Sequence, residues 1–210
     1  MVNVMLIYEE AKIISALDRL SDRFRTVFAL LCATRLLPAY RRFHSLTGNG
    51  DPPAVDSLAD RLWADCLEEP QDEAHLQDAL ERIMALIPTE AEGLHLEFQA
   101  TAEDAVAALA YAYRARLIGS SREAAWAARR AYEARDTVVE GLLDREGTAC
   151  EEPKTRLSHP FVQRELAHQQ KDLERLAKLE AAPNATEQLV NLKEESERNA
   201  DTCGDTDQGT

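Results

Sequence analysis

Glycine and proline are scarce in this sequence, with eight of each among 210 residues. Runs of β-branched residues are almost absent, whereas alanine, leucine, glutamate and arginine dominate. These common residues lose little side-chain freedom in a helix, and few helix breakers interrupt them. The composition therefore disfavours sheet and predicts an all-α protein.

Long apolar runs and paired cysteines are also missing. The densest apolar run covers residues 27–33 and is far shorter than the roughly 20 residues that cross a bilayer. The N-terminus has no basic leader, so we expect no signal peptide. The four cysteines show no CxxC spacing, which is typical of reduced thiols and predicts a cytoplasmic protein. They are Cys32, Cys66, Cys150 and Cys203.

Positive charge is in deficit, because the formal net charge is −14. The deficit is concentrated in residues 51–100, which hold two bases and thirteen acids. Such a balance repels nucleic acid and anionic membranes at long range, so we expect neither as a partner. The acidic block is either a docking surface for a basic protein or a solvated charged face, and the sequence leaves both interpretations open.

Recognisable catalytic motifs are lacking as well. The Gly48-x-Gly50 turn has no following lysine and no strand before it, so it is no phosphate loop. Two Glu-x-x-His pairs occur, at Glu92/His95 and Glu165/His168, and such pairs hold metals in some helical bundles. The first pair lies beside a glycine in a connection after Pro88, which spoils the geometry. We therefore predict no metal and no cofactor.

Apolar stripes at helical spacing predict a compact bundle of about seven helices. Pro38 falls inside the second helix, whose centre is apolar all round, and it should kink this central helix because an amide donor is missing. Thr101 and Asp104 form a capping box that begins the fifth helix, and Gly119 ends it. Alanines at helical spacing follow in the sixth helix, so these two helices should form a tight hairpin. The predicted helices cover about residues 6–20, 21–47, 52–66, 71–87, 101–117, 120–142 and 158–176.

After Pro183 the chain becomes acidic, amide-rich and nearly free of aromatic residues. Segments of this composition bury too little apolar surface to offset the entropy of ordering. We therefore predict a single α-helical domain over residues 1–182 and a disordered acidic tail over 183–210. In the tail, the apolar residues near Leu189 are expected to form a transient turn at most.

The stretch from Phe28 to Cys66 contains Arg35-Leu-Leu-Pro38-Ala-Tyr40-Arg-Arg-Phe43, then Thr47-Gly48-Asn-Gly50-Asp51, then Leu62-Trp63. This order resembles the YjaG-like family of bacterial proteins, a domain of unknown function (DUF416), over roughly residues 15–181. The resemblance implies an all-α single domain and supplies no activity. It also implies that the tail after Pro183 is an addition specific to this protein.

Arg35 is the most informative single residue, because it lies one turn before Pro38 and next to the predicted core. A partly buried arginine needs a carboxylate or free carbonyl groups. Asp51 and the carbonyl of Thr34 are the predicted partners, in which case Arg35 clamps the kink to the turn at 48–51. The alternative is an anion-binding pocket that Arg35 forms with Tyr40 and Trp63.

Together these features favour a non-enzymatic protein-interaction or regulatory module, whose partner is a basic protein or a second copy of the chain. One alternative is an enzyme or small-molecule binder with a pocket near Arg35, Tyr40 and Trp63. Another is an immunity-type inhibitor of a basic toxin, which acidity and small helical size alone suggest.

Overall fold

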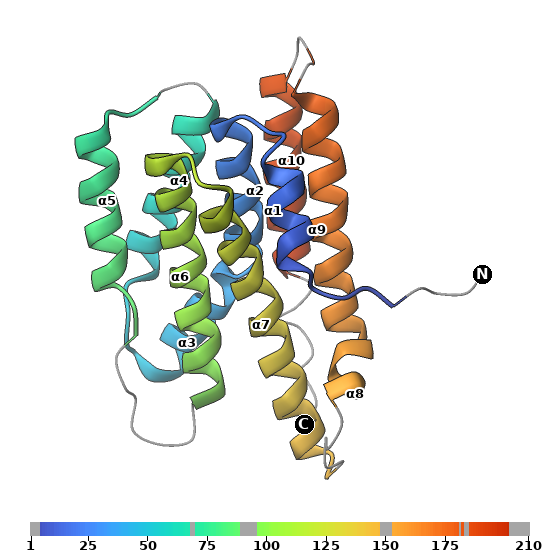
Figure 1. The fold of residues 1–210 in the computed structure, drawn as a ribbon. Helices are drawn as coiled ribbons and strands as arrows, with labels where there is room; N and C mark the ends of the chain where they lie inside the picture. The colour runs from blue at the N-terminus through green and yellow to red at the C-terminus, as the bar shows by residue number, and fades with distance from the viewer. Residues whose placement is uncertain are drawn as a thin grey trace.

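A computed structural model describes residues 5–67, 70–88, 96–147, 153–180, 182 and 185–201. All regular structure among them is α-helical, in ten segments that lie side by side in a bundle (Figure 1). The prediction of an all-α bundle is confirmed, although with more helices than expected. The helices are α1 (Glu10–Leu17), α2 (Asp22–Thr34), α3 (Leu37–Thr47), α4 (Pro52–Leu67), α5 (Glu73–Ala85), α6 (Leu96–Ile118), α7 (Ser121–Arg145), α8 (Pro153–Ser158), α9 (Pro160–Leu179) and α10 (Ala185–Asp201).

The central bent helix consists of α2 and α3. Every side chain of α2 from Thr26 to Thr34 is buried, as expected for an element that is apolar all round. The predicted kink is confirmed, but the helix breaks at Arg35 and Leu36, and Pro38 lies in the first turn of α3. Proline is tolerated there because the first amides of a helix have no internal partner.

The hairpin of α6 and α7 packs closely along its length, as the alanine pattern predicted. Gly119 adopts φ +60 between the two helices, and the Ser120 side chain accepts a hydrogen bond from the Glu123 amide, so Ser120 caps α7. One detail was wrong, because α6 begins at Leu96 rather than at Thr101. The Thr101 hydroxyl donates to the Phe98 carbonyl inside the helix instead of capping its start.

The predicted disorder of the tail is wrong for residues 185–201, which form α10 on the surface of α2. Leu189 and Leu192 are buried, and the Ser196 hydroxyl donates to the Leu31 carbonyl at 2.9 Å. Few apolar residues suffice here, because α2 and its neighbours already provide an ordered apolar surface. Residues 202–210 lie outside the described part of the chain.

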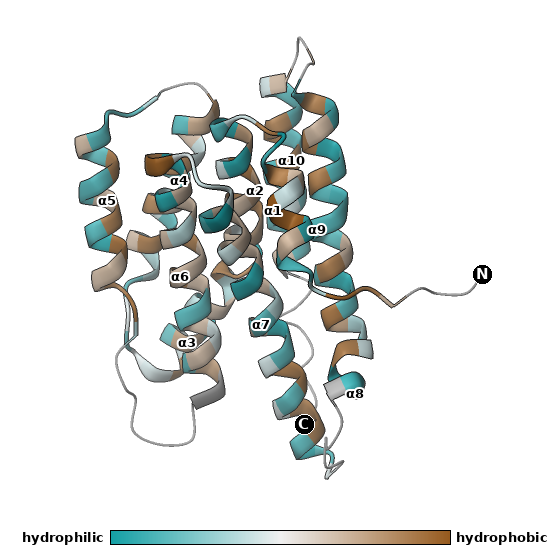
Figure 2. Ribbon diagram, viewed as in Figure 1, coloured by the Kyte–Doolittle hydropathy of each residue, from teal (hydrophilic) through white to brown (hydrophobic). Residues whose placement is uncertain are grey.

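Teal hydrophilic and brown hydrophobic residues alternate along the ribbons of α5 and α9 (Figure 2), and the buried residues of both helices include leucines, such as Leu76 and Leu176. None of the described helices is both long and apolar enough to span a membrane. Residues 6–9, which were predicted to be part of the first helix, precede α1 without helical structure.

Candidate functional site

Arg35 lies at the end of α2 and is only 3% exposed. Its Nε and Nη2 donate to the two oxygens of Glu165, each at 2.9 Å, and its Nη1 donates to Asp172 Oδ2 at 2.8 Å. Both carboxylates project from one face of α9, two turns apart. The predicted partner, Asp51, is therefore wrong, and Arg35 joins α2 to α9 rather than the kink to the turn at 48–51.

A second arginine completes this buried network. Arg135 of α7 donates to the Arg35 carbonyl at 2.8 Å, and this carbonyl lies where the helix breaks. The Gln169 amide group donates both to Glu165 Oε1 at 2.9 Å and to the Ala128 carbonyl at 3.0 Å. The network therefore joins α2, α7 and α9 through two cationic and two anionic side chains.

Burial and charge act against each other on the two carboxylates. Burial disfavours ionisation of Glu165, but the charge and hydrogen bonds of Arg35 more than offset it, so its pKa lies below the usual value. For Asp172 burial prevails over Arg35, and its pKa is raised. The pKa of Arg35 itself is raised because both carboxylates outweigh the burial of its charge. Each nitrogen of the Arg35 guanidinium thus has an internal partner, as in a structural clamp.

The turn at 48–51 is held by Tyr40. Its hydroxyl donates to the Leu86 carbonyl and accepts from the Asp51 amide, both at 3.1 Å. Gly50 has φ +87, and a Cβ there would lie 2.7 Å from the Tyr40 hydroxyl oxygen, so glycine is required twice over. Asp51 caps α4, because its side chain accepts from the Ala54 amide at 3.1 Å.

Trp63 is buried on α4, and its indole nitrogen donates to the Thr34 hydroxyl at 3.2 Å. It also lines a cavity of about 330 Å³ between α3, α4 and α10. Arg35 and Tyr40 do not line this cavity, so of the three predicted pocket residues it includes Trp63 alone. The lining residues are Thr34, Leu37, Arg41, Asp56, Ala59, Asp60, Trp63, Lys193, Glu197 and Ala200.

The Glu-x-x-His pair on α9 is divided between two environments. Glu165 belongs to the Arg35 clamp, while His168 is half-buried, and burial lowers its pKa. Among the described residues, no three His, Cys, Asp or Glu side chains gather where a metal could be held. Glu92 and His95 lie outside the described residues.

The two described cysteines are buried thiols. Cys32 Sγ lies 3.6 Å from Arg35 Nη2, and burial raises its pKa in spite of this positive charge. Burial likewise raises the pKa of Cys66 to about 12. Thiols of this kind react slowly, because the thiolate is the nucleophile. Cys150 and Cys203 lie outside the described residues.

A feature that the sequence analysis missed is the segment before α1, which lies against α7 and α9. The Leu6 amide donates to Gln163 Oε1 at 2.8 Å, and the Tyr8 hydroxyl donates to the Ala125 carbonyl at 2.8 Å. The apolar, partly β-branched and aromatic residues at positions 4–8 are typical of extended backbone and were the available signal.

Fold and clamp together define a helical-bundle protein whose middle is fixed by buried charge pairs. The chain belongs to the family described as protein of unknown function (DUF416), whose sequence model matches residues 12–202. The match includes α10, so the tail helix is part of the family region and not an addition specific to this protein. The YjaG-like name of the family is not confirmed by this match.

A solved structure supports the same fold. The chain is similar to the crystal structure of a DUF416 family protein from Shewanella baltica OS155, with a TM-score of 0.73 and 18% sequence identity. The likeness covers 87% of this chain and 92% of the other. At this identity it establishes the fold alone. No curated protein matches the chain.

Proposed function

We propose that this protein is a non-enzymatic interaction module that binds a basic partner protein through the outer face of α5. The observation that carries the proposal is a difference within the acidic block: the carboxylates of α4 form ion pairs with other helices, whereas those of α5 are exposed. On α4, Asp56 pairs with Arg41 at 2.9 Å, and Asp60 pairs with Lys193 at 2.8 Å. Asp65 of α4 is likewise paired with a base of α6. These carboxylates join helices to one another.

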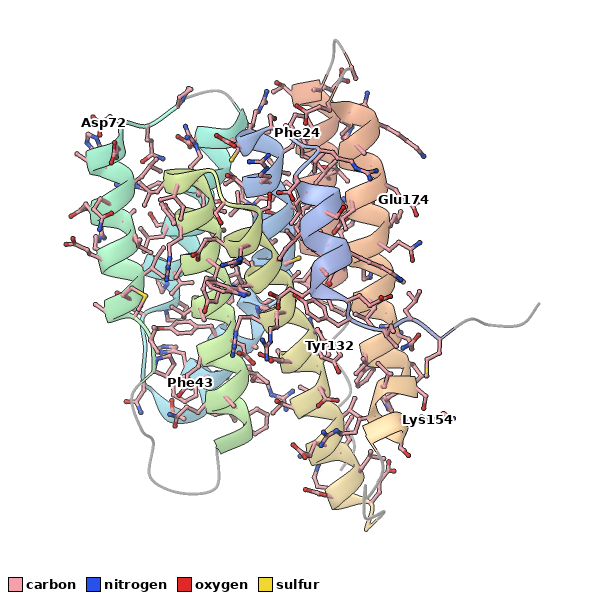
Figure 3. The ribbon with its side chains drawn as sticks, viewed as in Figure 1. Phe24, Phe43, Asp72, Tyr132, Lys154 and Glu174 are labelled. Carbon is pink, nitrogen blue, oxygen red and sulfur yellow. The ribbon has the colours of Figure 1, made fainter. Side chains whose placement is uncertain are left out.

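The carboxylates of α5 are placed differently. Glu73, Asp78 and Glu81 are exposed, and Asp72 lies at the outer end of the helix (Figure 3). Hydrogen bonds from His75 lower the pKa of Asp72, which keeps it anionic. Met84 adds an apolar side chain that is 53% exposed. An apolar contact flanked by anionic side chains suits a basic protein segment, because charge complementarity speeds association and suppresses wrong partners.

The test uses two variants of the protein, each expressed in the native host with one photo-crosslinking residue. The first variant carries it at position 77 of α5, and the control variant carries it at position 177 of α9. Ala177 is exposed on α9, away from the acidic block. We expect a basic protein to crosslink at position 77 only, and Asp78→Lys with Glu81→Lys to abolish the product without changing the melting temperature. Equal crosslinking at both positions, or none, contradicts the proposal.

The cavity beside Trp63 favours a second candidate function, the binding of a small molecule. Its volume of about 330 Å³ lies within the range of ligand pockets. Ala59 lines it and is almost fully buried, so Ala59→Leu would fill part of the space. A metabolite that raises the melting temperature of the wild type and not of Ala59→Leu supports this function. A toxin-neutralising role is the special case in which the basic partner of α5 is a toxin.

A further inference from the structure

The segment before α1 is bound to the rest of the protein as an extended peptide. Its side chains alternate, because Met5 and Ile7 are 38% and 54% exposed, whereas Leu6 and Tyr8 are partly buried. A period of two is the pattern of extended backbone with one side against a surface. In Figure 1 this blue segment runs from the start of α1 across α9.

Gln163 of α9 recognises the main chain of this segment. Its Oε1 accepts from the Leu6 amide at 2.8 Å, while its Nε2 donates to the Leu6 carbonyl at 2.9 Å. The side-chain amide thus pairs with a single residue in the way that two peptide groups pair in a sheet. The same Nε2 also donates to the Leu157 carbonyl at 2.7 Å, which fixes its orientation. Such main-chain recognition is independent of the sequence of the bound segment.

Two side-chain sites add sequence preference. Leu6 packs against Val139, Val162 and Leu166, which form a small apolar cluster apart from the main core. Tyr8 stacks on Tyr132, with ring centroids 5.5 Å apart and planes within 8°, and its hydroxyl donates to the Ala125 carbonyl. Tyr132 is labelled on α7 in Figure 3, near the point where the segment crosses.

Departure of the segment would uncover the small cluster and, at Tyr8, an edge of the main core. The buried residues of α1, Ile13 and Leu17, belong to the main cluster, while Leu6 packs against the small one and Tyr8 against both. The segment also fills its groove incompletely. An open cavity of about 350 Å³ remains beside Ile7 and Tyr8. Leu157 and Tyr132 also line it, and the charged side chains of Glu10, Arg129 and Glu133 complete its lining. An occupant with a larger side chain at the position of Ile7 would bury more apolar surface than this chain does.

We propose that the groove between α7 and α9 binds an extended segment of a partner protein with a Leu-x-Tyr pattern and a large apolar residue in the middle. Residues 5–8 then act as an intramolecular competitor that the partner displaces. This surface is separate from the outer face of α5 and stands on different contacts, so either proposal holds without the other.

The test measures binding of a fluorescein-labelled synthetic peptide of residues 2–9 by fluorescence anisotropy. The full chain with Leu6→Ala and Tyr8→Ala, whose own segment is weakened, should bind the peptide at least about tenfold tighter than the wild type, because a tethered competitor acts at millimolar effective concentration. Adding Gln163→Glu, which loses the donor to the main chain, should abolish binding. A peptide with tryptophan in place of Ile7 should bind tighter, and one with aspartate in place of Leu6 should not bind.

The outcomes separate the possible occupants. No binding to the doubly substituted chain, equal binding to it and to the wild type, or binding that Gln163→Glu leaves unchanged overturns the proposal. Circular dichroism melts check that each variant is folded, and Tyr8→Phe, which removes only the hydroxyl, should shift binding in the same direction by a smaller factor. A wild-type dimer in sedimentation velocity that Tyr8→Ala dissociates identifies a second copy as the occupant and overturns the assignment to a foreign partner.

Discussion

The hairpin of α6 and α7 and the clamp between α2 and α9 hold the same bundle together by opposite means. In the hairpin, small side chains let two helices pack closely, and Ala124, Ala127 and Ala131 are fully buried. In the clamp, the buried Arg35 is held by two carboxylates 130 and 137 positions further along the chain. The first interface depends on size, and the second on charge balance.

This difference decides how each region responds to change. A close-packed interface of alanines loses stability when volume is added, because there is no room for extra methylene groups. A buried ion pair contributes little net stability when it is complete, since desolvation offsets the attraction. Removal of one partner, however, leaves an uncompensated buried charge. We therefore expect joint replacement of the charged residues of the clamp to cost little stability, whereas replacement of a single one costs much.

The largest expected effect is that of Arg35→Met. Glu165 and Asp172 would remain in the interior without their cation, and breaking a buried pair in this way costs about 3–5 kcal/mol. The shift of the urea midpoint, at unchanged slope, measures the loss of unfolding free energy. Arg129→Met is the matched control, because the Arg129 side chain is 48% exposed on α7. A loss no larger than that of the control would refute the clamp.

Replacing the whole clamp sharpens the comparison. Arg35→Met combined with Glu165→Met and Asp172→Leu removes three of the four charges of the network and keeps a similar volume, while Arg135 keeps its hydrogen bond to the main-chain carbonyl of residue 35. Such replacements of a buried ionic group are often neutral or stabilising. We expect this triple variant to recover most of the stability that Arg35→Met loses. If it is as unstable as the single variant, the clamp contributes through geometry that apolar side chains cannot reproduce.

The second largest effect is expected in the hairpin. Ala127→Leu adds volume to a fully buried position of α7, and overpacking of this kind costs about 1–3 kcal/mol. Ala177→Leu makes the same change on the exposed face of α9, where it should cost almost nothing. The midpoints of urea unfolding compare the two variants. Equal stability of both would show that the hairpin has unfilled space.

The sequence predicts the hairpin and misses the clamp for physical reasons. Helical spacing, a capping serine and Gly119 are local signals, and each acts within a few residues. The clamp instead depends on which face of α9 meets α2, and nothing local to Arg35 specifies this. Arg35 was therefore correctly predicted to be a buried cation in need of partners, but its carboxylate partners are Glu165 and Asp172 rather than Asp51.

Two further errors have the same origin. Residues 185–201 have the composition of a solvated segment, yet α10 needs only Leu189, Leu192 and Ala200 once α2 offers an ordered surface. Leu6 and Tyr8 were assigned to the first helix, which was predicted over about residues 6–20. Their extended backbone is instead stabilised by Gln163 and Tyr132, which lie more than 120 positions away. Tertiary partners, rather than local preference, decide both segments.

The smallest expected effect distinguishes the two carboxylates of the clamp by pH. The folded-state pKa of Asp172 is raised, so the native protein holds this proton more tightly than the unfolded chain. The resulting stability is present below the unfolded pKa of about 3.9 and is lost as pH rises through the folded pKa. Glu165 acts in the opposite sense, since its pKa is lowered and its contribution is lost as pH falls. Asp172→Asn keeps an acceptor for Arg35 but cannot titrate.

The wild type should therefore lose unfolding free energy relative to Asp172→Asn as pH rises from about 4 toward neutrality. Urea midpoints at a series of pH values measure the difference. Asp144→Asn, at an exposed position of α7, is the control and should follow the wild-type curve. If the curves of Asp172→Asn and the wild type stay parallel, Asp172 is ionised in both states, and Arg35 rather than burial dominates its environment. The clamp would then hold two full negative charges against Arg35, with Arg135 as the only further compensation in the network.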